Sequence, residues 1–216
     1  EKKAYVDVTS TNLEMWKMKG EVMFRSFIQM SRLERKALGI CRGRILDIGG
    51  GSGCHSLHLQ KRHKDVDVID ISPGCIEVMK KRKIRNPIHC NLFSVKEKQY
   101  DTLLMLMNGL GICGSLDGLN LFFQYIKTLL AKDGQVIADS TDLASLYDIE
   151  TLPIHTGEYY GETKFVMTYK NIVGDSFGWL YIDFETLTYY AGLHGFLCKK
   201  IMTDKSGKYL VRITIN

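Results

Sequence analysis

The order of apolar and polar positions changes twice along the 216-residue chain. Residues 11–38 carry apolar side chains at helical spacing, which predicts one or two helices and an N-terminal helical cover over residues 1–40. Between residues 43 and 141, short apolar runs alternate with helical patterns, as in "RILDIG" followed by "GCHSLHLQKRH". This alternation is typical of right-handed βαβ units, so we predict an α/β core with a parallel sheet.

After residue 141 the pattern favours paired strands. The stretch 142–182 holds two strand-like runs joined at "NIVGDS", which predicts a β-hairpin insertion. Its aromatic residues either pack the hairpin on the sheet or line a pocket for a small organic molecule, and its strands can also pair with another subunit. Residues 183–216 predict a helix and two final strands. The aromatic residues of the insertion are Tyr147, Tyr159, Tyr160, Phe165, Tyr169, Phe177, Trp179 and Tyr181.

Composition narrows the class of protein. Hydrophobic residues make up 45% and charged residues 25%, and no apolar run approaches the roughly 20 residues of a membrane helix. Without an apolar signal core, we expect one cytoplasmic domain with its six cysteines reduced. The net charge of +5 is mild, and the run "KKRKIR" (80–85) is better explained as a solvated helix end than as a nucleic-acid site.

His55, His58 and His63 lack partners that would complete a metal site, so we expect no metal.

The stretch "ILDIGGGSGCHSL" (45–57) places a glycine loop between a predicted strand and a predicted helix. Open α/β sheets bind ligands at this edge. No lysine follows the loop as a phosphate-binding P-loop requires, and Cys54 stands where a dinucleotide fingerprint has its third glycine. The spacing present is D-x-G-x-G-x-G, from Asp47 to Gly53. An aspartate just before the glycines suits a cationic ammonium and is poorly placed beside a pyrophosphate.

The second strand ends in Asp70, 19 residues after Gly51. A carboxylate at this position accepts hydrogen bonds from the ribose hydroxyls of an adenosine, a spacing that suits NAD as well. With this second motif in place, the chain resembles the class I S-adenosylmethionine-dependent methyltransferases. The resemblance covers residues of about 43–141 and rests on four motifs: "LDIGGGSGCHSLHL", "VIDISPGCIEVMKKR", "YDTLLMLMN" and "LLAKDGQVIADS".

The resemblance implies a Rossmann-like, doubly wound, seven-stranded sheet, mostly parallel with an antiparallel C-terminal strand. It also implies S-adenosylmethionine as methyl donor and S-adenosylhomocysteine as product. Two positions depart from the family pattern: Asn91 stands where an acid usually meets the adenine, and Met107 replaces the aspartate of a "D-G-N-I-G-I-G-G" stretch found in a subgroup of small bacterial members of unclear substrate. The implied cofactor-binding residues are Asp47, Gly49, Gly50, Gly51, Gly53, His55, Asp70, Ile71, Asn91, Leu92, Met107 and Asn108.

Methyl transfer from a sulfonium is an in-line displacement, so the protein mainly aligns the reactants. A general base is needed only when the acceptor carries a proton at neutral pH. We therefore expect methylation of a small-molecule acceptor by a monomer or homodimer, without a nucleic-acid or membrane partner. The alternatives are methylation of RNA or protein, an NAD-dependent enzyme, and a non-catalytic cofactor-binding scaffold. Candidate catalytic residues are Asn108, Asp139, Asp142, His155, Tyr159 and Tyr160, of which the two aspartates have a helix cap as their alternative role.

Overall fold

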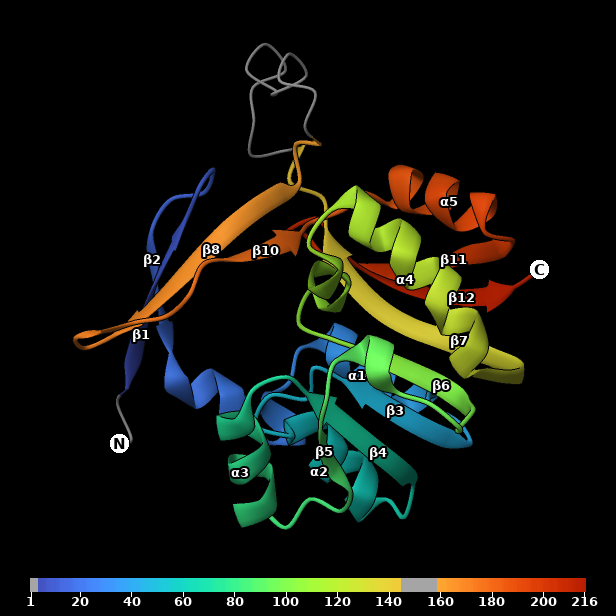
Figure 1. Cartoon of the computed structure of the whole chain (residues 1–216), viewed down its shortest axis with the longest axis horizontal. Coiled ribbons are helices and arrows are strands. Elements are labelled where there is room, and N and C mark those ends of the chain that lie inside the picture. Colours follow the sequence, from blue (N-terminus) through green and yellow to red (C-terminus); the bar gives the residue numbers. More distant parts are fainter. Residues whose placement is uncertain (1–3, 145–158) are drawn as a thin grey trace.

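The computed structural model describes residues 4–144 and 159–216, and a seven-stranded sheet forms its core (Figure 1). The strands of this core sheet are β3 (Arg44–Ile48), β4 (Asp65–Asp70), β5 (Pro87–His89), β6 (Tyr100–Met105), β7 (Leu130–Thr141), β11 (Phe196–Thr203) and β12 (Lys208–Ile215). They lie in the order β11-β12-β7-β6-β3-β4-β5. Strands β3 to β7 are parallel, whereas β12 is antiparallel to β7 and β11. This arrangement confirms the predicted mostly parallel sheet with an antiparallel C-terminal strand.

Helices cover both faces of the core sheet, and most begin at a residue that favours the start of a helix. The described α-helices are α1 (Arg32–Ile40), α2 (Cys54–Lys61), α3 (Pro73–Lys81), α4 (Leu116–Leu129) and α5 (Phe184–Leu193). Side chains of α1, α2 and α3 pack on one face, and those of α4 and α5 on the other. Ser31 and Glu34 form a capping box at α1, and Pro73 occupies the first turn of α3.

A second sheet stands beside the core and contains the predicted hairpin (Figure 1). Its strands are β1 (Tyr5–Ser10), β2 (Trp16–Lys19), β8 (Glu162–Tyr169), β9 (Ile172–Val173) and β10 (Phe177–Leu180). β8 pairs antiparallel with β10, which confirms the hairpin, and its other edge pairs with β1 of the same chain. That edge of the hairpin is therefore already covered within the chain.

The prediction of helix over residues 11–38 is wrong for most of this stretch. Only α1 is an α-helix; before it lie β2 and two short 3-10 turns, η1 (Gly20–Phe24) and η2 (Phe27–Gln29). Trp16 and Met18 alternate with lysines and pair across the sheet with Val8 and Val6. β2 is stabilised by pairing with β1, which lies outside residues 11–38. The spacing of apolar residues within that stretch therefore does not reveal the strand.

Two predictions from composition can be compared with the structure. No helix in the described ranges is long and apolar enough to cross a membrane. All six cysteines lie in the described ranges and none is disulfide-bonded, with Cys41 and Cys54 buried.

Candidate active site

The glycine loop after β3 is bent by left-handed backbone and bonded to the neighbouring strand. Gly49, Gly51 and Gly53 have φ angles of 70°, 57° and 76°, a region that favours glycine. The N–H groups of Gly49 and Gly50 donate to the Ile69 carbonyl at 2.9 and 3.1 Å, and Gly53 N–H donates to the Gly50 carbonyl at 2.8 Å. These N–H groups are used within the protein, which disfavours a loop that grips phosphates with its backbone.

Asp70 lies at the carboxyl end of β4 and is held by two backbone bonds. One carboxylate oxygen accepts from Gly51 N–H and the other from Ser72 N–H, each at 2.8 Å. A carboxylate has about four acceptor positions, so this rigid group retains capacity for two further donors. The Asp70 side chain is half-buried beside the loop.

Asp47 is buried beneath the loop on the side of α2. Its Oδ2 accepts from Ser56 Oγ at 2.6 Å. Burial raises the pKa of the Asp47 carboxyl, and the negative charge of Asp70 adds to this rise. The loop therefore lies between two carboxyl groups, Asp70 on the next strand and Asp47 buried underneath.

His55 faces the N-terminal segment, where its Nε2 lies 2.9 Å from Glu34 Oε1. Arg25 also contacts this glutamate oxygen. Burial alone would raise the pKa of the Glu34 carboxyl, but hydrogen bonds from His55, Arg25 and Ser31 N–H together hold it well below its usual range. His58 stacks on Phe27 with ring centroids 4.0 Å apart. In the described part of the chain, no three His, Cys, Asp or Glu side chains gather as a metal site.

The segments around the loop come from distant parts of the chain. Met23 of η1 lies against Gly51, where an added Cβ would sit 2.9 Å from its methyl carbon, and Ser52 Oγ donates to the Met23 carbonyl. On the other side, Ile112 of η4 (Gly109–Cys113) reaches Gly49, whose Cβ would lie 2.7 Å from Ile112 Cδ1. Neither contact has a signal in the local sequence, so the sequence analysis missed both residues.

The positions expected to meet the adenine lie at the ends of β4 and β5. Ile71 is 70% exposed, so it offers an apolar surface next to Asp70. Leu92 is buried, and the side chain of Asn91 accepts from Phe93 N–H at 2.9 Å, which leaves its amide N–H₂ to donate. Asn91 therefore caps the turn η3 (Leu92–Ser94) in the structure.

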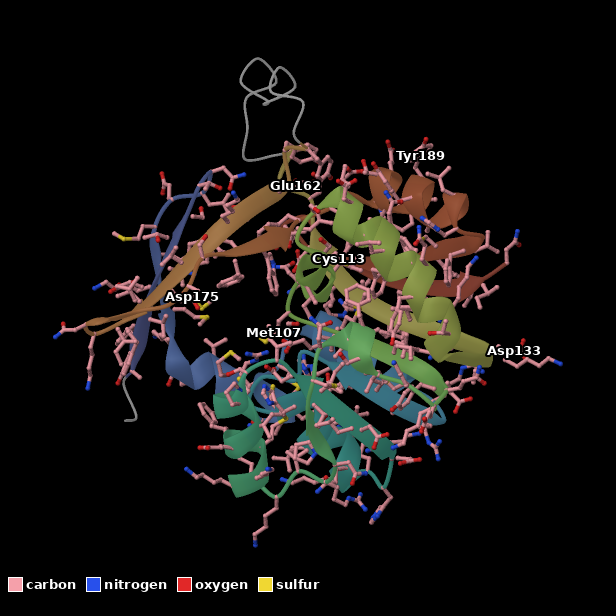
Figure 2. All side chains as sticks on the ribbon, in the orientation of Figure 1. Met107, Cys113, Asp133, Glu162, Asp175 and Tyr189 are labelled. Carbon is pink, nitrogen blue, oxygen red and sulfur yellow. The ribbon has the colours of Figure 1, made fainter. Side chains whose placement is uncertain are left out.

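Met107 and Asn108 follow β6, and both have left-handed backbone, with φ of 69° and 56°. Figure 2 shows Met107 on the side of the core that faces the second sheet, whereas Asp133 lies at the opposite edge. Asn108 Oδ1 accepts from Thr141 Oγ1 at 2.7 Å. Two adjacent non-glycine residues in this conformation are uncommon and persist only where the surrounding structure holds them.

Comparison with known proteins decides the family. A model of the methyltransferase domain matches residues 45–134. The crystal structure of an S-adenosylmethionine-dependent methyltransferase from Bacteroides fragilis, in complex with S-adenosylhomocysteine, is 43% identical. The match covers 99% of this chain and 89% of that one, with a TM-score of 0.90. The chain belongs to the S-adenosylmethionine-dependent methyltransferases.

More distant structures share the fold of this methyltransferase. CcbJ from Streptomyces caelestis is 12% identical, covers 88% of this chain and 92% of its own, and has a TM-score of 0.66. CalS10, an amino pentose methyltransferase from Micromonospora echinaspora, is 13% identical, covers 85% and 87%, and has a TM-score of 0.55. No curated protein matches the chain. The cofactor is S-adenosylmethionine, and the glycine loop with its two aspartates fits the chemistry of this cofactor's amino-acid and ribose parts.

The catalytic candidates of the methyltransferase converge on the ends of β6 and β7. Asp139 is fully buried and accepts from Gly109 N–H at 2.9 Å. Tyr160 OH donates to Asp142 at 2.8 Å, and Tyr159 OH donates at 2.7 Å to Asp183, a residue that the sequence analysis missed. His155, like Tyr147, lies outside the described residues.

Both tyrosines are better hydrogen-bond donors than bases. Burial raises the pKa of Tyr159 and of Tyr160 far above neutrality, and their acidic partners add to the rise. The phenols therefore stay protonated and direct their protons to Asp142 and Asp183. The bonds of Tyr160 also fix the start of the hairpin segment against the end of β7.

Proposed function

We propose that this methyltransferase methylates a small-molecule acceptor, held between the carboxyl edge of the core sheet and one apolar face of the second sheet. Cross-strand partners lie on the same face of an antiparallel sheet. Phe165 pairs with Phe177, Met167 with Val8, and Val8 with Trp16. We call this surface the aromatic face; its members are Val6, Val8, Trp16, Met18, Phe165, Met167, Phe177 and Trp179.

The contact between Trp179 and η4 carries this proposal. A methyl group at Gly111 would lie 2.1 Å from the indole ring, so the ring packs directly on the glycine backbone. Gly111 neighbours Ile112, which touches the cofactor loop at Gly49. The aromatic face and the glycine loop are thus in contact through a single turn, as an acceptor site and a donor site must be.

Different residues near the loop are suited to different parts of the cofactor. Asp70 is suited to the ribose hydroxyls, Asp47 to the ammonium side, and the amide N–H₂ of Asn91 with Leu92 to the adenine. S-adenosylmethionine supplies an activated methyl group, which leaves alignment of the acceptor as the main task of the protein. Rigid aromatic side chains align a planar or apolar acceptor at small entropic cost, because each has few rotatable bonds.

A large polyanionic acceptor such as RNA is less well supported. The inward positions of the aromatic face hold no lysine or arginine among the described residues. The run "KKRKIR" lies in the last turn of α3 and just after it, and its Arg82, beside the cofactor loop, is engaged within the chain, donating to the Ser52 carbonyl at 2.7 Å and to Ser52 Oγ at 2.8 Å.

Methyl-labelled S-adenosylmethionine tests the proposal. The enzyme is incubated with the label and with a cell extract that is then separated into small molecules, RNA and protein. We expect label in the small-molecule fraction with the parent protein and none with Gly51→Val. Label in RNA or protein instead would overturn the small-molecule acceptor while leaving methyl transfer intact.

A further inference from the structure

A buried ion pair lies directly under the turn that follows β6. Lys208 Nζ, at the start of β12, lies 2.8 Å from Asp139 Oδ2 on β7. The Asp139 side chain is fully buried and that of Lys208 is 23% exposed. The other carboxylate oxygen of Asp139 accepts from Gly109 N–H, the first residue of η4. One carboxylate therefore links β12 to η4.

This link stabilises a left-handed backbone conformation that is uncommon in residues other than glycine. Met107 and Asn108 precede Gly109, and both lie in the left-handed region. Such residues persist only where the surrounding structure holds them. Two bonds from β7 do so here, one from Gly109 N–H to Asp139 and one from Thr141 Oγ1 to Asn108.

The position of η4 matters because it touches both halves of the site. Ile112 contacts the glycine loop at Gly49, and the Trp179 ring of the aromatic face packs on Gly111. A displacement of η4 would shift the two surfaces relative to each other. Methyl transfer is sensitive to such shifts, since alignment of the reacting atoms supplies much of the catalysis.

We propose that Asp139 and Lys208 are positioning residues that fix η4 and, through it, align the cofactor loop with the aromatic face. The inference rests on the proposed function only for the assignment of these two surfaces. Asp139 acts through Gly109 and not as a general base, because its side chain is enclosed and both oxygens face the protein. Lys208 neutralises the buried carboxylate, which would otherwise be costly to keep charged.

Tryptophan fluorescence tests this directly. The chain has two tryptophans, so Trp16→Phe leaves Trp179 as the sole reporter of η4. In this background, Asp139→Asn keeps the shape of the side chain and removes its charge. We expect a shift in Trp179 emission and S-adenosylhomocysteine binding weakened by about tenfold, equivalent to about 1.4 kcal/mol. Lys208→Met should act in the same direction, and Lys208→Arg should restore most of the parent behaviour.

The fold supplies a matched control in β4, three strands away from β7 in the core sheet. Asp67 is also a buried carboxylate, with Lys98 Nζ 3.0 Å from its Oδ2 and Tyr100 OH donating to it at 3.0 Å. Asp67→Asn should lower the thermal midpoint without changing Trp179 emission or affinity. If Asp139→Asn and Lys208→Met stay folded with both readouts unchanged, or change them no more than Asp67→Asn does, the inference is overturned.

Trp179 emission is measured without ligand. It therefore tests this inference independently of the proposed cofactor site. If the folded parent protein does not bind S-adenosylhomocysteine, the proposed cofactor site is wrong. Trp179 emission still decides whether Asp139 fixes η4. Should Asp139→Asn fail to fold, Lys208→Met and Thr141→Val provide the test, with Thr141→Val expected to shift the emission less than Lys208→Met does.

Discussion

Asp70 is the single residue on which we expect cofactor binding to depend most. Asp70→Ala removes the acceptor of two backbone N–H groups as well as the proposed ribose ligand, so the loop loses a support and we expect the cofactor to lose a contact. We expect S-adenosylhomocysteine binding at least about tenfold weaker in calorimetric titration. Asp65→Ala, at the exposed start of the same strand, is the control and should bind normally. Equal affinities would show that Asp70 is not a cofactor ligand.

Gly51 tests the loop itself. A β-branched residue at φ 57° is strained, and this backbone strain is the main cost, because its Cβ would lie 2.9 Å from the Met23 methyl carbon, the far end of a flexible side chain. Gly51→Val should abolish measurable S-adenosylhomocysteine binding and cost about 1–3 kcal/mol of stability. Gly39 in α1 has open space around it, so Gly39→Ala should leave binding unchanged and stabilise by about 0.5 kcal/mol. Tight binding by Gly51→Val would refute the assigned position of the loop.

Among the elements, α1 is joined to α2 and to the N-terminal segment by Glu34, whose Oε1 contacts both His55 and Arg25. The pKa of the Glu34 carboxyl is lowered on folding, so its contribution to stability is present above its ordinary value of 4.5 and is lost as the pH falls below it. We expect Glu34→Gln to cost about 1–3 kcal/mol at pH 7 and to flatten the loss of stability from about pH 5 downward, because the unfolded carboxyl takes up its proton around the ordinary pKa of 4.5. Urea unfolding across this range measures it. Exposed Glu77→Gln is the control, and a parent-like profile for Glu34→Gln would contradict the assignment.

Local sequence could predict the elements whose start, end and type are determined by side chains within the element itself. β3, α2, β4 and α3 follow from apolar periodicity, a glycine stretch and a proline, and the same motifs place Asp47 and Asp70. β2 could not be predicted in this way, because its pairing with β1 depends on a sheet completed by β8 more than 140 residues later. For the same reason the sequence did not indicate Lys208, Asp183 or the packing of Trp179 on Gly111, which exist only after distant strands meet.

In the whole molecule, three contacts join the second sheet, or the η1 turn that follows its strand β2, to the core. Ser52 Oγ donates to the Met23 carbonyl at the cofactor loop, and Trp179 packs on Gly111. Glu162 at the start of β8 accepts from Leu116 N–H at 2.8 Å and so caps α4; Figure 2 shows its position at that end of the strand. Two of these contacts reach the loop or the turn beside it, which ties the stability of the second sheet to cofactor binding.

Both tryptophans lie in the second sheet, Trp16 on β2 and Trp179 on β10, whereas most helix lies on the core. Thermal unfolding followed by tryptophan emission and by far-UV circular dichroism therefore reports the two parts separately. We expect one shared transition, because the contacts above make the sheets cooperative. S-adenosylhomocysteine at about 100 times its Kd should stabilise by about 2.7 kcal/mol and raise both midpoints together by about 5–10 °C. An emission transition that comes first and ignores the ligand would mean that the second sheet folds independently, and the aromatic face would then be too loosely held to align an acceptor.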